Sequence, residues 1–195
     1  MKTKTLIVVL LDESGSMAGK SPDVVGGFNS FIDSQKAIAE DEGRMLFIKF
    51  NTAVSVVFDS MKLDHVPPLN ETTYRPGGNT ALYDAISIGV DLADKQKLPD
   101  ERVICVILTD GEENSSRKTT LAMVKDLIAK RESVGNWTFT YIGENPDEWS
   151  RETGTKLGNT VSFDQTDTGA NFHSAGYGCS GLRTQSDGQS SELFR

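Results

Sequence analysis

Residues 6–17 read LIVVLLDESGSM, an uninterrupted apolar run that passes directly into an acidic and hydroxyl-rich segment. A strand that is apolar at every position is buried on both faces, which is typical of a central strand in a parallel sheet. The run ends at Asp12, and Ser14 and Ser16 follow at alternate positions. Alternate residues of an extended segment point to the same side, so these three oxygen-bearing side chains share one side of the loop. Gly15 allows the loop to turn tightly, and the spacing indicates a ligand site rather than a simple turn.

Apolar runs alternate with segments of helical periodicity along the whole chain, which predicts an α/β fold with a mostly parallel central sheet. The runs at 45–50 and 54–58 are separated by a short turn, so we expect them to pair antiparallel at the edge of the sheet. Further strands are expected at 103–108, 139–142 and 161–163. Helices are expected from Ser21-Pro22 to a stop at Gly43, from Thr80 onward, and at 118–134 and 147–157.

The length of 195 residues and the ordinary composition predict a globular chain with a single main domain. We assign residues 1–170 to this domain. Glycine, serine, glutamine and arginine become frequent after residue 170, and apolar residues become sparse. We therefore expect residues 171–195 to form a Gly/Ser-rich, flexible C-terminal tail.

Charge and hydropathy narrow the classes of partner. The net charge is −8, so no basic excess is present to displace counterions from a nucleic acid, and we expect no nucleic-acid partner. No apolar run approaches the roughly 20 residues that span a bilayer, so we expect no membrane partner. The apolar stretch near the N-terminus is too short for a signal peptide and is followed by Asp12 and Glu13. The two cysteines imply no disulfide framework, and the default expectation is a cytoplasmic protein.

Two of the predicted parallel strands end in an aspartate, Asp12 after the first and Asp110 after the strand at 103–108. Ligands of open parallel sheets bind at the carboxyl ends of the strands, so these side chains can meet at one edge together with Ser14 and Ser16. The segment Gly-Gly-Asn-Thr at 77–80 adds a loop that can approach closely and a further hydroxyl, that of Thr80. Two carboxylates and three hydroxyls suit a hard divalent cation, Mg²⁺ with Mn²⁺ or Ca²⁺ as alternatives. No Cys/His cluster indicates a zinc site.

Three segments together resemble the metal-ion-dependent adhesion site (MIDAS) of von Willebrand factor type A domains. They are DESGSM at 12–17, GGNTALYDAI at 77–86 and LTDGEEN at 108–114, and the resemblance covers roughly residues 4–165. It implies a Rossmann-like three-layer sandwich, with helices on both faces of a mostly parallel sheet that has one antiparallel edge strand. It also implies the metal ligands, directly or through water: Asp12, Ser14, Ser16, Thr80 and Asp110.

The resemblance implies a noncatalytic protein-binding module with no catalytic residues, in which an Asp or Glu of a partner protein completes the metal shell. An adaptor inside the cell is the first hypothesis. An accessory subunit of an ATPase or another larger machine would use the same site, and any ATPase activity would then belong to the partner, because the chain has no P-loop. A third hypothesis is a metal-dependent phosphoester hydrolase with Asp12 as nucleophile. Against it, Ser14 stands where such enzymes typically have a second carboxylate.

Three glutamates flank these motifs. Glu13 lies between the inward-facing residues, so the alternation predicts that its side chain points away from the site. Glu112 and Glu113 follow Asp110 directly. They either tune the site electrostatically or belong to a solvated loop.

Overall fold

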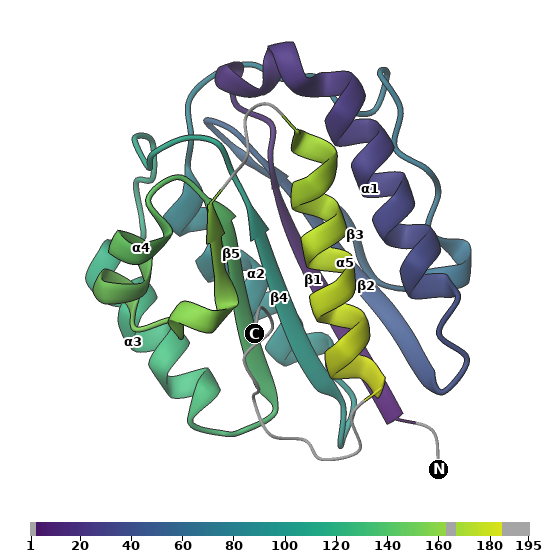
Figure 1. Ribbon diagram of the computed structural model, residues 1–195. Coiled ribbons are helices and arrows are strands. Elements are labelled where there is room, and N and C mark those ends of the chain that lie inside the picture. Colours follow the sequence, from purple (N-terminus) through teal and green to yellow (C-terminus); the bar gives the residue numbers. More distant parts are fainter. Residues whose placement is uncertain (1–2, 163–166, 185–195) are drawn as a thin grey trace.

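The computed structural model describes residues 3–162 and 167–184, which form one six-stranded sheet between two layers of helices (Figure 1). The strand order is β3-β2-β1-β4-β5-β6. Only the β2–β3 pair is antiparallel among the paired strands described, and it lies at an edge of the sheet. The predicted fold class is therefore confirmed. The strands are β1 (Thr3–Asp12), β2 (Asp41–Phe50), β3 (Val54–Lys62), β4 (Arg102–Leu108), β5 (Trp137–Gly143) and β6 (Thr160–Ser162).

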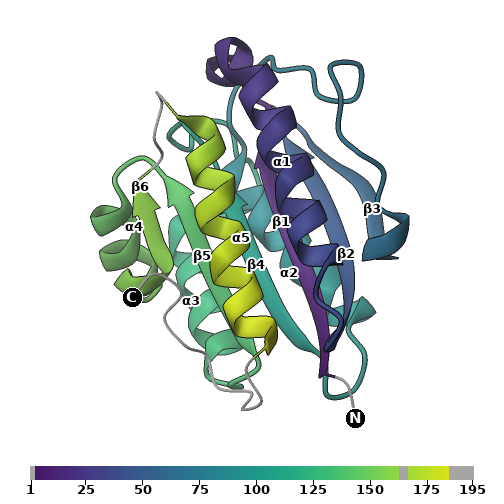
Figure 2. The ribbon, with the colours of Figure 1, turned by 45° about the vertical axis from the view of Figure 1, so that its right-hand side comes forward.

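The helices divide between the two faces of the sheet. One face is covered by α1 (Ser21–Lys36) and α5 (Thr168–Thr184), which lie side by side in both views of the ribbon (Figures 1 and 2). The other face is covered by α2 (Leu82–Gln96), α3 (Leu121–Glu132) and α4 (Pro146–Thr153). Three short 3₁₀ helices complete the elements: η1 (Gly15–Lys20), η2 (Leu63–His65) and η3 (Leu157–Asn159).

Strand β1 supplies side chains to both halves of the core. Ile7, Val9 and Leu11 join the cluster under α1 and α5, whereas alternate residues of the same strand join the cluster under α2 and α3. The six side chains of residues 6–11 are each at most 1% exposed. Burial of a side chain of this size contributes about 1.5–3 kcal/mol, so the fully apolar run specifies the centre of the sheet.

The first helix ends earlier than the sequence suggested. The expected stop was Gly43, but α1 ends at Lys36 and Gly43 lies within β2, opposite Thr5 of β1. A Cβ atom on Gly43 would lie 2.5 Å from Nη2 of Arg183, a residue of α5. The glycine is therefore needed for the close passage of the Leu63 and Arg183 side chains over β2, not for a helix stop.

The prediction of a flexible tail from residue 171 is wrong for the described part of that segment. Residues 168–184 form α5, which packs on α1 and the sheet through side chains at most 2% exposed: Phe172, Ala175, Cys179 and Leu182. These apolar residues recur at helical spacing between glycines and serines, and composition alone conceals that pattern. The two helices approach closely, because a Cβ atom on Gly27 would lie 2.5 Å from the ring of Phe172. Residues 185–195 of the predicted tail lie outside the described residues.

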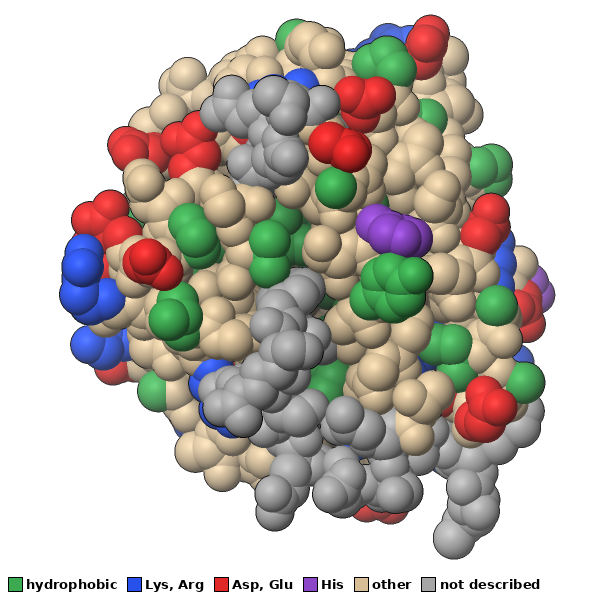
Figure 3. Space-filling model, in the orientation of Figure 1, with side chains coloured by type: hydrophobic (Ala, Val, Ile, Leu, Met, Phe, Trp, Pro, Cys, Tyr) green, Lys and Arg blue, Asp and Glu red, His purple; other side chains and the backbone are tan. Residues whose placement is uncertain are grey.

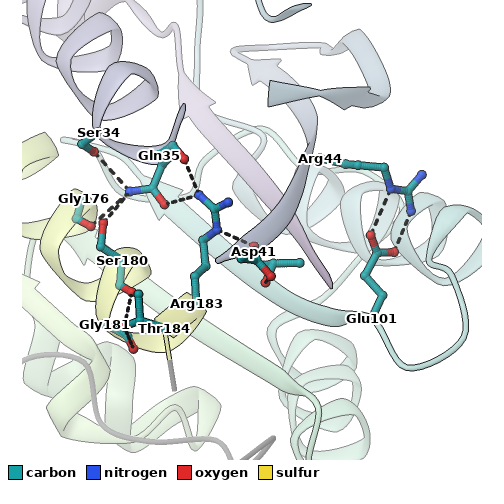
Figure 4. Close-up of polar contacts among 11 residues, drawn as sticks. Ser34, Gln35, Asp41, Arg44, Glu101, Gly176, Ser180, Gly181, Arg183 and Thr184 are labelled. Atoms are coloured by element: carbon teal, nitrogen blue, oxygen red, sulfur yellow. Dashed lines mark hydrogen bonds and ion pairs between the residues drawn. The ribbon is translucent and has the colours of Figure 1, made fainter. Parts of the chain in front are cut away.

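A buried polar network fixes the C-terminal end of α5 (Figure 4). The guanidinium of Arg183 donates to Asp41 Oδ2 at 2.7 Å and to the carbonyl oxygen of Gln35 at 2.7 Å. The other carboxylate oxygen of Asp41 accepts from the Thr5 hydroxyl at 3.1 Å, and Gln35 Nε2 donates to Ser180 Oγ at 3.1 Å. The side chains of Arg183 and Asp41 are at most 1% exposed, so each charge depends on the other for compensation.

Figure 3 shows the face of the molecule formed by α1 and α5. Its hydrophobic side chains are scattered among polar ones (Figure 3). Tyr177 of α5 is 71% exposed and lies edge-on to the ring of His173, with ring centroids 4.7 Å apart. Among the residues described, no helix has the length and apolar character needed to cross a membrane.

The network at Arg183 predicts a large effect of one substitution. Arg183→Ala would leave the Asp41 carboxylate buried without its partner, and we expect a loss of about 3–5 kcal/mol in the free energy of unfolding. Urea denaturation measures it. The control is Lys95→Ala, which breaks an exposed ion pair with Asp91 on α2 and should change stability by only about 0.3–0.5 kcal/mol. Equal effects of the two substitutions would contradict this role of Arg183.

Candidate metal centre

The topology of the sheet brings Asp12 and Asp110 to the same edge. β1 lies between β2 and β4 and runs parallel to both, and Leu11 of β1 is paired with Leu108 of β4. The chain leaves β1 toward one side of the sheet and later returns to β4 on the other, so this is a point where the strand order reverses. Loops at such a point diverge and leave a crevice in which ligands of open α/β sheets bind.

Asp12 is wholly buried and fixed by two hydrogen bonds. Its Oδ1 accepts from the backbone N–H of Ser14 at 2.7 Å, and its Oδ2 accepts from the Thr109 hydroxyl at 2.6 Å. Burial raises the pKa of the Asp12 carboxyl above its ordinary value, while these hydrogen bonds oppose the rise and the nearby charge of Asp110 adds to it. A bound cation would offset both the cost of burying the ionised carboxylate and its repulsion by Asp110.

A chain of polar contacts links both serines to Asp110. The hydroxyls of Ser14 and Ser16 lie 3.0 Å apart, and Ser16 Oγ donates to Asp110 Oδ1 at 2.5 Å. The other oxygen of Asp110, Oδ2, accepts from the ammonium of Lys20 at the end of η1. The first and third predicted segments therefore meet through their side chains, as their positions at the strand ends suggested.

Thr80 reaches the same place from the loop before α2. Its side chain is 3% exposed. A Cβ atom built on Gly111 would lie 3.5 Å from Thr80 Oγ1 and 3.6 Å from Ser16 Oγ, so the two hydroxyls border the space that this glycine leaves open. The third segment also holds Thr80 in place, because the Asn114 side chain accepts from the Thr80 N–H at 2.9 Å.

The glycine pair before Thr80 forms backbone hydrogen bonds with the loop after β1. The carbonyl oxygen of Gly78 accepts from the Gly15 N–H at 3.0 Å, and the Gly77 N–H donates to the Glu13 carbonyl oxygen at 2.9 Å. Gly78 has a φ of +80°, a conformation that side chains rarely adopt. A Cβ atom there would also lie 2.6 Å from the Thr52 hydroxyl.

The neighbouring glutamates have structural partners. Glu13 points away from the site, as predicted, and its Oε1 accepts from Lys49 Nζ and from the Arg75 N–H, both at 2.6 Å. Glu113 accepts four hydrogen bonds, from the N–H groups of Tyr83, Ser115 and Ser116 and from the Ser116 hydroxyl. Glu113 therefore connects this loop to the first turn of α2, a role that neither expectation, electrostatic tuning of the site or a solvated loop, describes. Glu112 is exposed.

Sequence reasoning missed Thr109, Asn114 and Lys20. Thr109 orients Asp12, Asn114 positions Thr80, and Lys20 pairs with Asp110. A signal existed for Thr109, because alternation at the end of a strand places it on the opposite side from Asp110. Lys20 lies eight positions after Asp12, and no periodicity links it to residue 110.

The assembled side chains fit a hard divalent cation. Asp12, Ser14, Ser16, Thr80 and Asp110 offer only oxygen donors, which Mg²⁺, Mn²⁺ and Ca²⁺ prefer. Across residues 3–162 and 167–184, no group of three or more His, Cys, Asp or Glu side chains is arranged to hold a metal ion. The candidate centre has only two carboxylates, and its remaining donors are hydroxyls, so the assignment of these five residues as ligands stays a prediction.

Comparisons with known proteins agree with this architecture. The family model for the von Willebrand factor type A domain matches residues 7–169. No curated protein matches the chain. Among solved structures, proximal thread matrix protein 1 from the mussel byssus is 16% identical with a TM-score of 0.65, and the similarity covers 90% of this chain and 46% of that one. The chain thus spans less than half of that protein.

Two further solved structures contain a metal. One is the same mussel protein with a zinc-occupied MIDAS motif, which is 17% identical with a TM-score of 0.61 and coverage of 88% of this chain and 46% of that one. The other is the manganese-loaded TRAP protein of Plasmodium vivax, which is 17% identical with a TM-score of 0.58 and coverage of 86% of this chain and 71% of that one. At these identities the similarity establishes the fold.

The loop at Gly78 supplies a test of how the site is held. Gly78→Ala would force a side chain into a positive-φ position and against Thr52, and we expect a loss of about 1–3 kcal/mol of stability. Gly77→Ala is the matched control, because a Cβ atom there meets nothing within 4 Å. We expect that variant to keep its stability or gain slightly. Urea denaturation of the metal-free protein compares them, and equal stability of the two variants would contradict the role assigned to Gly78.

Proposed function

Because the chain belongs to the von Willebrand factor type A domain family, we propose that it is a noncatalytic protein-binding module that captures its partner through a divalent cation. The observation that carries the proposal is the convergence of five oxygen-bearing side chains from three loops at the carboxyl edge of β1 and β4. Each of these residue types alone is common in a turn or a helix cap. Their meeting at one point requires a further explanation, and a ligand site supplies it.

The proposed ligands are Asp12, Ser14, Ser16, Thr80 and Asp110. The bound cation would supply an electrophilic position that a carboxylate oxygen from outside can occupy. We propose Mg²⁺ as the ion, with Mn²⁺ or Ca²⁺ as alternatives, on the strength of the all-oxygen donor set. The zinc and manganese of the two similar structures support a divalent ion in general.

The weak hydroxyl donors of the site favour an acidic partner residue. Three of the five donors are neutral hydroxyls, so the two carboxylates carry all of the negative charge that faces the cation. Ser14 hydrogen-bonds with Ser16, and Ser16 donates to Asp110, which holds the two hydroxyl oxygens toward one point. An Asp or Glu side chain of a partner protein would therefore complete the site with a charge-assisted interaction.

The geometry of Asp12 disfavours a nucleophilic role. Both of its carboxylate oxygens accept hydrogen bonds, and its side chain has no exposed surface. Ser14 occupies the place of a second carboxylate, so the hydrolase hypothesis gains no support. We also propose that the module works inside the cell, which is consistent with two free, buried cysteines, Cys105 and Cys179.

Substitution of Asp110 tests the proposal directly. Asp110→Ala should abolish Mg²⁺ binding, because it removes one of only two carboxylates, while the sheet stays folded, because the residue lies in a loop after β4. Isothermal titration calorimetry measures Mg²⁺ binding, and thermal unfolding monitors the fold. The matched control is Asp126→Ala, which removes the same charge from an exposed position on α3 and should bind Mg²⁺ as the wild type does.

The same proteins then test the partner. Protein captured from lysate by the wild type in Mg²⁺, and lost both in EDTA and with Asp110→Ala, would support capture through the cation. Unchanged Mg²⁺ affinity of Asp110→Ala would refute the assignment of the site. Partners that bind regardless of metal and mutation would refute the proposed mechanism of capture.

A further inference from the structure

Lys20 makes a contact within the candidate centre that none of the proposed ligand roles explains. Its ammonium is paired with Oδ2 of Asp110, 90 positions further along the chain. The Asp110 side chain in this pair is 1% exposed, and that of Lys20 is 17% exposed. The pair is therefore shielded on the carboxylate side and reachable by solvent on the lysine side, where a long side chain can move away.

The position of Lys20 is unfavourable for the start of α1. It is the N-cap residue of α1, a helix of 16 residues, and its side chain makes no capping hydrogen bond. A helix N-terminus carries partial positive charge and favours Ser, Thr, Asp or Asn at this position. A lysine here opposes the dipole of α1, whereas the last turn of η1, to which Lys20 also belongs, favours a basic residue. A residue that breaks a local rule in this way has its compensation elsewhere, and the structure shows that compensation at Asp110.

Both oxygens of Asp110 are already bonded within the chain. Ser16 Oγ donates to Oδ1 at 2.5 Å, and Lys20 donates to Oδ2. The ammonium is a positive charge tethered at the carboxylate that a divalent ion would use. An ion that takes Asp110 as a direct ligand at Oδ2 must exchange with this ammonium, since the two cations would otherwise repel each other at contact distance.

We propose that Lys20 is a built-in competitor of the divalent cation and that it sets the metal affinity of the site. This inference rests on the proposed metal-dependent function. In the metal-free protein, Lys20 balances the charge of Asp110 and so weakens the repulsion between the Asp12 and Asp110 carboxylates. Binding of the cation releases Lys20 from Asp110, and the free energy of that ion pair is subtracted from the free energy of metal binding. The site is therefore half-occupied at a higher metal concentration than it would be if the five ligands alone set its affinity.

The test compares the Mg²⁺ affinities of four full-length proteins by calorimetry. Lys20→Met should bind Mg²⁺ about tenfold more tightly than the wild type, because it removes a charge-assisted hydrogen bond that metal binding must break. Lys20→Gln is a second neutral variant with a polar end and should also bind more tightly. Lys20→Arg keeps the charge and should stay near the wild type.

The matched control is Lys49→Met. Lys49 also ends at this edge of the sheet and forms an ion pair, but its partner is Glu13, which points away from the site. The substitution changes the net charge by the same unit without touching Asp110. Its effect on Mg²⁺ affinity should be much smaller than that of Lys20→Met, and thermal unfolding confirms that each variant is folded.

The outcomes separate this inference from the proposed function. If Asp110→Ala abolishes Mg²⁺ binding while both neutral Lys20 variants bind as the wild type does or more weakly, the competitor role is refuted and the metal site stands. A gain in Lys49→Met equal to that in Lys20→Met would refute it too, because the effect would then be one of net charge. No Mg²⁺ binding by the wild type or by any Lys20 variant would refute both proposals.

Discussion

The parallel pairing of β1 with both β2 and β4 is the constraint on which the other features of the molecule depend. It requires β1 to be buried on both faces, and residues 6–11 meet that requirement with an apolar side chain at every position. It also places the residues after β1 and after β4 at the same edge. A carboxylate at each of those two strand ends is then enough to create a region of concentrated negative charge, whatever the loops do. The loops add hydroxyls, a glycine turn and a lysine around that charge.

The sequence was sufficient to predict the sheet, its antiparallel edge and the convergence of Asp12 with Asp110, because these follow from short-range patterns and one rule of topology. Its failures have a common physical cause. Gly43 was interpreted through its local propensity, whereas its actual role depends on Leu63 and on Arg183, which lies 140 positions away. Likewise α5 was hidden because its apolar residues are separated by glycines and serines, among them Gly176, where a Cβ atom would lie 3.3 Å from Ser34 Oγ of α1. Contacts between distant segments decided both cases.

The same distinction holds within the candidate centre. The five proposed ligands are recognisable because their spacing is local: two serines at alternate positions after Asp12, a glycine pair before Thr80, an aspartate after a strand. The extended loop expected for the first of these segments ends at Ser14, because Ser16 lies in η1. The residues that support them, Thr109, Asn114 and Glu113, act across loops through hydrogen bonds that no spacing reveals. These contacts matter because hydroxyl ligands carry little charge, so their effect on a cation depends on how firmly their oxygens are held in position.

Two buried or partly buried ion pairs lie at opposite ends of the parallel strands and have different roles. Asp41 begins β2 and is paired with Arg183, and both side chains are buried and bonded to further groups. Arginine suits that place, because its planar, weakly hydrated guanidinium donates several hydrogen bonds at once and gains little from moving into water. Asp110 follows β4 and is paired with Lys20, whose ammonium is a compact charge on a flexible stem with a route to solvent. A permanent pair requires full burial and several fixed donors, whereas an exchangeable one requires a single mobile donor. The difference between arginine at one end and lysine at the other is therefore the difference between a structural contact and one that a cation can replace.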